Sequence, residues 1–134
     1  MSIIHYLSVG HIIAIHDTLI EEFGGSFGLR DHELLESAST QPMQSFGGED
    51  LHPTLFDKAA AYAFFISENQ PFIDGNKRTA SSVSAVFLDI NGFELNCPSG
   101  EIYETMMNLA NKRLSREGLV KWFKKNSLKK GRKK

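Results

Sequence analysis

The residues best suited to chemistry lie in one short segment, QPFIDGNKRTA at positions 70–80. Its loop 74–76 precedes a predicted helix, and the glycine in it permits a tight turn that lets a phosphate approach the backbone. The first N–H groups of a helix have no intrahelical partner, and the helix dipole is positive there, so the position favours anions. Lys77 and Arg78 add full positive charge in that first turn, where cations without an anion are unfavourable. This pattern indicates a phosphate or nucleotide site, although an Asp–Gly turn beside a solvated Lys-Arg pair has the same sequence.

A metal ion would fit beside such a site. Asp74 is a reasonable Mg²⁺ ligand, because Mg²⁺ prefers one or two carboxylates together with phosphate oxygens. The single cysteine, Cys97, excludes an internal disulfide and a thiolate metal cluster. Cys97 has no activating neighbour in the sequence, so we assign it no chemistry.

Length and composition indicate one globular domain. The chain has 134 residues, of which 41% are hydrophobic and 23% charged. No apolar run approaches the roughly 18 to 20 residues of a membrane span, and the first residues lack the features of a signal peptide. We therefore expect a cytoplasmic protein without a membrane partner.

Charge is unevenly distributed along the chain. All 16 acidic residues lie within positions 1–118, whereas eight of the 15 basic residues lie in the last 16 positions. We expect a domain over residues 1–126 and a basic C-terminal tail over residues 127–134. The tail could contact RNA, DNA or an acidic partner, or it could be a solvated and frayed end. We favour the solvated end, and therefore expect nucleic acid not to be a partner.

Apolar periodicity predicts an all-α bundle of about six helices. Ser8, Asp31, Ser99 and Ser115 are suitable N-cap residues, and Pro53 suits the first turn of another helix. That helix, ending at Gln70 before Pro71, is apolar on most faces, as is the next one from about residue 76 to 91. We expect these two helices to form the buried centre. Residues 40–52 are predicted to form a loop or a small hairpin, and residues 93–96 a short strand.

The segment PFIDGNKRTA closely resembles the signature of the Fic/Doc family, H-x-F-x-[D/E]-G-N-x-R. Five positions match: Phe72, Asp74, Gly75, Asn76 and Arg78. Residues 23–38, 55–66 and 87–95 also resemble the death-on-curing (Doc) branch, so the resemblance covers about residues 5–126. It implies the compact all-α Fic fold, with the motif loop between the two central helices.

The resemblance also implies a role for each matching residue. Asp74 would be the Mg²⁺ ligand that bridges the phosphates of ATP or another nucleoside triphosphate (NTP). Gly75, Asn76 and the helix N-terminus would bind the phosphates, together with Lys77 and Arg78. Arg78 would also neutralise charge in the transition state. Phe72 would be a structural anchor for the loop, and residues 40–52 would form the flap that aligns the target backbone.

Two positions bear on which group is transferred. AMP-transferring relatives mostly have Gly and a second Arg where this chain has Lys77 and Ser81. The lysine is typical of Doc toxins, which are described as moving the γ-phosphoryl group of ATP onto a translation elongation factor. The resemblance thus favours phosphoryl over nucleotidyl transfer.

The family's catalytic histidine belongs at position 70, where this chain has Gln70. Histidine can accept a proton from the target hydroxyl near neutral pH, whereas a glutamine amide cannot. Loss of a general base lowers the rate by about 10²- to 10⁴-fold. We therefore expect an intact phosphate site but an impaired chemical step. The catalytic positions would be 70, 77 and 78, of which only position 70 has lost its function. The glutamine could be an engineered change or a natural loss.

Three other residues are candidates to replace the proton acceptor that is missing at position 70. His16 lies on an apolar helix face and is expected to be a buried core histidine. His52 precedes a proline at a helix start and is expected to cap the helix or lie on the surface. Glu68 is expected to be a solvated acid at a helix end.

Three functions are consistent with these residues. The first is a Doc-type toxin that modifies a protein hydroxyl, here without its base. The second is a non-catalytic nucleotide-binding module, and the third is nucleic-acid binding through the tail. The resemblance also implies an inhibitory antitoxin partner and a target protein such as an elongation factor. A self-inhibitory motif is not expected, because Arg113 occupies the place of its Ser or Thr.

Overall fold

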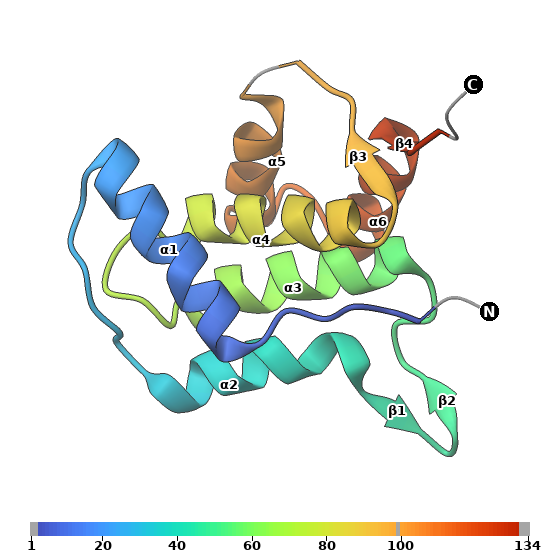
Figure 1. Cartoon of the computed structure of the whole chain (residues 1–134), viewed down its shortest axis with the longest axis horizontal. Coiled ribbons are helices and arrows are strands. Elements are labelled where there is room, and N and C mark those ends of the chain that lie inside the picture. The colour runs from blue at the N-terminus through green and yellow to red at the C-terminus, as the bar shows by residue number, and fades with distance from the viewer. Residues whose placement is uncertain (1–2, 99, 132–134) are drawn as a thin grey trace.

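Six α-helices and two short pairs of antiparallel strands make up the part of the chain described by the computed structural model, residues 3–98 and 100–131 (Figure 1). This arrangement confirms the all-α bundle expected from the sequence. The elements follow one another as α1 (Val9–Phe23), α2 (His32–Thr40), η1 (Gln41–Met43), β1 (Ser45–Phe46), β2 (Glu49–Asp50), α3 (Leu55–Asn69), α4 (Asn76–Ile90), β3 (Phe93–Leu95), α5 (Glu101–Ala110), α6 (Arg116–Asn126) and β4 (Ser127–Lys129).

Most helix starts follow from capping side chains in the sequence. Ser8, Asp31 and Ser115 accept hydrogen bonds from the first turns of α1, α2 and α6, as predicted. The prediction that Pro53 lies in the first turn of a helix was wrong. Thr54 is the N-cap of α3, because its side chain and that of Asp57 form a reciprocal capping box. The predicted cap Ser99 lies outside the described residues, and α5 begins at Glu101.

The central pair of helices is α3 and α4, which lie side by side in the middle of the bundle (Figure 1). Four alanines of α3, Ala59, Ala60, Ala61 and Ala63, are completely buried. Such small side chains let neighbouring helices approach closely. The remaining helices pack around this pair, with α1 and α5 against α4, and α2 and α6 against α3. None of the helices in the described residues has the length and apolar character needed to cross a bilayer.

The predicted hairpin is present, but it lies at the N-terminal end of α3. Strands β1 and β2 pair in register Ser45 to Asp50 and Phe46 to Glu49. The buried Lys58 ammonium holds the hairpin by donating to Asp50 Oδ2 at 3.3 Å and to the His52 carbonyl. Since α3 has 15 residues, its two ends are about 22 Å apart. The hairpin lines neither cavity beside the loop that follows α3, so this conformation does not place it as a flap over that loop.

The start of the basic tail is part of the folded domain. Strand β4 pairs with β3, the strand expected over residues 93–96, with Leu95 opposite Ser127 and Phe93 opposite Lys129. The Lys130 ammonium lies 2.7 Å from the Asp89 carboxylate at the end of α4. Over the residues that the structure describes, the tail is therefore packed against the acidic body and not frayed.

His52 gives the fold a pH dependence. It is 7% exposed, and its pKa is lowered from 6.5 by burial, by Arg116 and by Lys58. As the pH falls below about 6.5, the unfolded chain therefore binds a proton at this position before the folded chain does. The free energy of unfolding should decrease as the pH falls below that value. Urea denaturation between pH 7.5 and 5 should show this loss in the wild type and a smaller loss in His52→Gln.

The control for this measurement is His32→Gln. His32 is exposed at the start of α2, so its replacement should leave the acid-dependent loss unchanged. Parallel stability curves for the wild type and His52→Gln would contradict the assignment to His52.

Candidate functional site

The loop of residues 70–75 joins α3 to α4 and adopts two left-handed backbone conformations. Gln70 caps α3 with φ 45° and ψ 60°, and Gly75 precedes α4 with φ 80°. A Cβ atom at Gly75 would lie 3.1 Å from Ile20 and 3.6 Å from His16. Glycine is therefore required at position 75 both by its backbone conformation and by the close approach of α1.

Asn76 closes this loop. Its side-chain oxygen accepts from Phe72 N at 3.0 Å, and its amide donates to Phe72 O at 3.0 Å. The Phe72 ring is 1% exposed and stacks on the His16 ring, with the centroids 3.8 Å apart and the planes 5° from parallel. The Asn76 side chain is thus engaged within the loop, and what remains of Asn76 for a ligand is its backbone N–H.

His16 supports the loop from α1. It is completely buried, as expected for a histidine on an apolar helix face. Its Nε2 lies 2.8 Å from the carbonyl oxygen of Asp74, and its Nδ1 lies 3.0 Å from the Asp17 carboxylate. A carbonyl oxygen only accepts, so Nε2 is the donor in that contact. His16 therefore fixes the backbone next to the predicted metal ligand and is not placed as a base beside Gln70.

A second support comes from the segment before α2. The Arg30 side chain donates to Gln70 O at 2.7 Å and to Asn69 O at 2.6 Å, and so satisfies carbonyl groups at the end of α3. Leu29 forms an isolated antiparallel bridge with Phe72. Sequence reasoning missed Arg30. The only available signal was the need of a helix C-terminus for hydrogen-bond donors, which does not say where along the chain the donor lies.

Asp74 is exposed, and its carboxylate is held by backbone groups. Oδ1 accepts from Gly75 N at 2.9 Å, and Oδ2 accepts from Ser26 N at 3.2 Å. Each carboxylate oxygen can accept more than one bond, so both retain capacity for a cation. No group of three or more His, Cys, Asp or Glu residues that could hold a metal occurs in residues 3–98 and 100–131. Asp74 therefore fits Mg²⁺ as a single carboxylate ligand, with phosphate oxygens and water completing the coordination.

The N-terminus of α4 is not capped by a side chain, unlike those of α1, α2, α3 and α6. Lys77 and Arg78 lie in its first turn. Among the described residues, no carboxylate comes within 4.0 Å of either cationic group. This end of α4 therefore presents free N–H groups and two cations without an anionic partner, which is the arrangement that binds phosphate.

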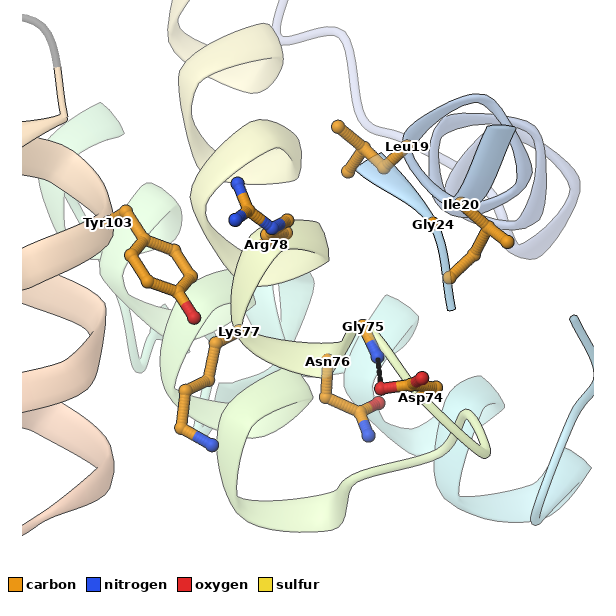
Figure 2. A pocket seen from close by; sticks show the side chains of 9 residues that line it. All are labelled: Leu19, Ile20, Gly24, Asp74, Gly75, Asn76, Lys77, Arg78 and Tyr103. Atoms are coloured by element: carbon orange, nitrogen blue, oxygen red, sulfur yellow. Dashed lines mark hydrogen bonds between the residues drawn. The ribbon is translucent and has the colours of Figure 1, made fainter. Parts of the chain in front are cut away.

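Two cavities flank this helix end. One cavity, of about 170 Å³, is lined by Arg78. Figure 2 shows its lining residues, with Tyr103 beside the first turn of α4 and Leu19 and Ile20 on α1. A second cavity, of about 350 Å³, is lined by Gln70 and by the ion pair of Glu68 and Lys112, whose charged groups lie 3.1 Å apart. Both cavities are lined by Asp74, Gly75, Asn76 and Lys77.

The structure thus brings the sequence-predicted residues together around one helix N-terminus, with Gln70 on one side and Arg78 on the other. Glu68 lines the larger cavity, whereas the sequence suggested only a solvated acid at a helix end. His52 precedes α3, so the whole length of that helix separates it from Gln70. His52 is therefore not a replacement base in this fold.

The contact between His16 and Asp74 should contribute to stability. Replacement of His16 by Leu leaves the buried side of the Asp74 carbonyl without its donor, and should lower the free energy of unfolding by about 1–3 kcal/mol. Urea denaturation measures this change. His32→Leu removes an exposed histidine and should change stability by less than about 0.5 kcal/mol. Equal stability of the wild type and His16→Leu would show that the hydrogen bond does not hold the loop.

Comparisons with known proteins agree with this architecture. The sequence model of the Fic/DOC family matches residues 6–88. The chain is 44% identical to Toxin Doc of Mycolicibacterium smegmatis over 73 residues, which are 54% of this chain and 56% of that protein. It is 30% identical to Protein kinase doc of Escherichia phage P1 over 90 residues, which are 67% of this chain and 71% of that protein. The match thus spans just over half of the Mycolicibacterium relative. The chain belongs to the Fic/DOC family.

Proposed function

We propose that this chain binds ATP or another NTP with Mg²⁺ at the N-terminus of α4, as a Doc-like member of a toxin–antitoxin pair. The observation that carries the proposal is the pair of cations, Lys77 and Arg78, at a helix N-terminus without a side-chain cap. No carboxylate of the described residues neutralises them. A polyphosphate would supply the missing negative charge and accept the free N–H groups.

The proposed reaction is transfer of the γ-phosphoryl group to a hydroxyl of a target protein. The hydroxyl oxygen forms a bond to the γ-phosphorus, the bond from that phosphorus to the β–γ bridging oxygen breaks, and the nucleoside diphosphate leaves. The hydroxyl proton passes to water, because Gln70 cannot accept it. The name of the phage relative, a protein kinase, favours this reaction over nucleotidyl transfer. Bound Mg²⁺ would neutralise phosphate charge next to Asp74.

Lys77, Arg78 and Gln70 would have different roles, according to the cavities that they line. Lys77 lines both cavities and would hold phosphate oxygens from the centre of the site. Arg78 would hold them from the smaller cavity and stabilise charge that develops during transfer. Gln70 lines the larger cavity, where the family motif has its histidine. A glutamine amide can hydrogen-bond the target hydroxyl but cannot accept its proton, so the chemical step is slow.

A non-catalytic nucleotide-binding module is the second candidate function, and Gln70 is the observation that favours it. All charged and backbone groups of the proposed phosphate site are present, and only the proton acceptor of the motif is absent.

Under either function, we propose that the chain acts in the cytoplasm, where NTPs and Mg²⁺ occur. The name of the Mycolicibacterium relative, a toxin, supports an inhibitory antitoxin as partner. The target, for which an elongation factor is the proposed class, stays a prediction.

Binding of Mg²⁺–ATP should be measurable in the chain with Gln70. Arg78→Ala and Lys77→Ala should each weaken the affinity about tenfold or more, because each removes a charged hydrogen-bond donor to phosphate. Isothermal titration calorimetry measures both. Arg113→Ala removes an exposed cation that lines neither cavity beside the loop, and should leave the affinity unchanged. If ATP does not bind, or if the Arg78 and Lys77 variants bind as well as the wild type, the proposed site is wrong.

Gln70→His should separate the two candidate functions. Restoration of a proton acceptor should raise the transfer rate by about 10²- to 10⁴-fold. The assay incubates the variant with a bacterial extract and ATP labelled at either the α- or the γ-phosphate, and follows labelled protein. Label from the γ-position alone indicates phosphoryl transfer, and label from the α-position indicates nucleotidyl transfer. If neither label reaches protein and expression does not slow bacterial growth, the enzyme function fails and the binding module remains.

A further inference from the structure

The Arg78 guanidinium lies close to two aromatic rings that come from different helices. Its Cζ atom is 4.2 Å from the ring centroid of Phe23, at the end of α1, and 4.7 Å from that of Tyr103 on α5. We propose that Phe23 and Tyr103, here called the aromatic clamp, are positioning residues that hold Arg78 ready for a phosphate group. The inference rests on the proposed function for the role of Arg78, whereas the clamp itself rests on these two contacts.

Both ring contacts of Arg78 are cation–π interactions. A cation within about 6 Å of an aromatic centroid is attracted to the face of the ring, and both contacts satisfy that distance. The planar guanidinium of arginine carries five N–H donors. In residues 3–98 and 100–131, no carboxylate competes for these groups. The clamp therefore restricts the position of the guanidinium, while no carboxylate of the described residues takes the place of an oxyanion.

The adjoining cavity is smaller than a pocket for a drug-sized ligand. Arg78 and Tyr103 line a space of about 170 Å³ together with the loop residues 74–77 (Figure 2). Pockets for drug-sized ligands measure roughly 300–1,000 Å³, so this one suits a phosphate group better than a whole nucleoside. Arg78 and Tyr103 thus line a cavity that has room for a phosphate group.

The clamp also accounts for an exposed aromatic residue. Phe23 is 59% exposed and is not part of the buried core. Its contact with Arg78 links the end of α1 to the first turn of α4, while Tyr103 links the same turn to α5. An arginine ordered before binding loses less conformational entropy when the ligand arrives, so the clamp should raise phosphate affinity.

The first experiment tests the clamp without any ligand. The Arg78 Nε–H resonance, assigned by ¹⁵N NMR with Arg78→Lys as reference, should be displaced by the ring currents of Phe23 and Tyr103. Tyr103→Leu and Phe23→Leu should each move it toward the position of a solvated arginine, whereas Tyr103→Phe, which keeps the ring, should leave it nearly in place. Phe64→Leu is the matched control, because it removes a ring that lies 5.3 Å from a different cation, Arg116. An unmoved resonance in Tyr103→Leu would overturn the clamp.

The second experiment tests the role of the clamp in binding. Calorimetric titration with Mg²⁺–ATP should show about three- to tenfold weaker affinity for Tyr103→Leu and a change within twofold for Tyr103→Phe and Phe64→Leu. The double variant Tyr103→Leu with Arg78→Ala should bind as weakly as Arg78→Ala alone, because Tyr103 acts through Arg78.

The outcomes distinguish failure of the clamp from failure of the site. If the losses from Tyr103→Leu and Arg78→Ala multiply in the double variant, Tyr103 acts independently of Arg78 and the positioning role is overturned. If Arg78→Ala binds ATP as well as the wild type while the resonance still moves, the clamp stands and the proposed use of Arg78 in phosphate binding fails.

Discussion

The pair of hydrogen bonds between the Asn76 side chain and the backbone of Phe72 is the constraint on which the site depends. A chain that leaves α3 and immediately begins α4 must expose polar backbone groups in a short loop. Asn76 satisfies two of them, and this fixes where α4 begins. That contact and the His16 contact to Asp74 satisfy polar groups within the loop, whereas no side chain caps the first N–H groups of α4. The bonds that stabilise the loop thus do not use the N–H groups that an anion would need.

The supports of this loop come from distant parts of the chain and are not interchangeable. His16 acts from α1 on Asp74, and Arg30 acts from the segment before α2 on the carbonyl groups of Asn69 and Gln70. Each satisfies a backbone oxygen that would otherwise lack a protein donor. The two central helices supply the frame, but the geometry of the site depends on α1 and on the segment before α2. Variants in those segments should therefore change binding without contacting the ligand.

Local signals in the sequence predicted the helices and strands well, whereas contacts between distant segments could not be predicted from it. Ser8, Asp31 and Ser115 could be identified because capping depends on neighbours within one turn. Pro53 was misplaced because Thr54 and Asp57 form a stronger start one residue later. The motif indicated where the proposed phosphate site lies, but the partners of Arg78 could not be predicted, since Phe23 and Tyr103 lie far from it in the sequence. The position of the hairpin and the pairing of β4 with β3 were missed for the same reason, because both depend on packing between distant segments.

The left-handed conformation of Gln70 has a consequence for the history of this position. Among residues with a side chain, histidine is one of those enriched several-fold in this region of backbone space, whereas β-branched residues are strained there. Glutamine and histidine codons differ only in their third base, so a single nucleotide change interconverts them. Arg30 fixes the backbone here through carbonyl groups that every amino acid has, so the exchange keeps both of these hydrogen bonds. The fold therefore allows a lineage to lose and regain its proton acceptor in one mutational step, as long as the surrounding loop is maintained.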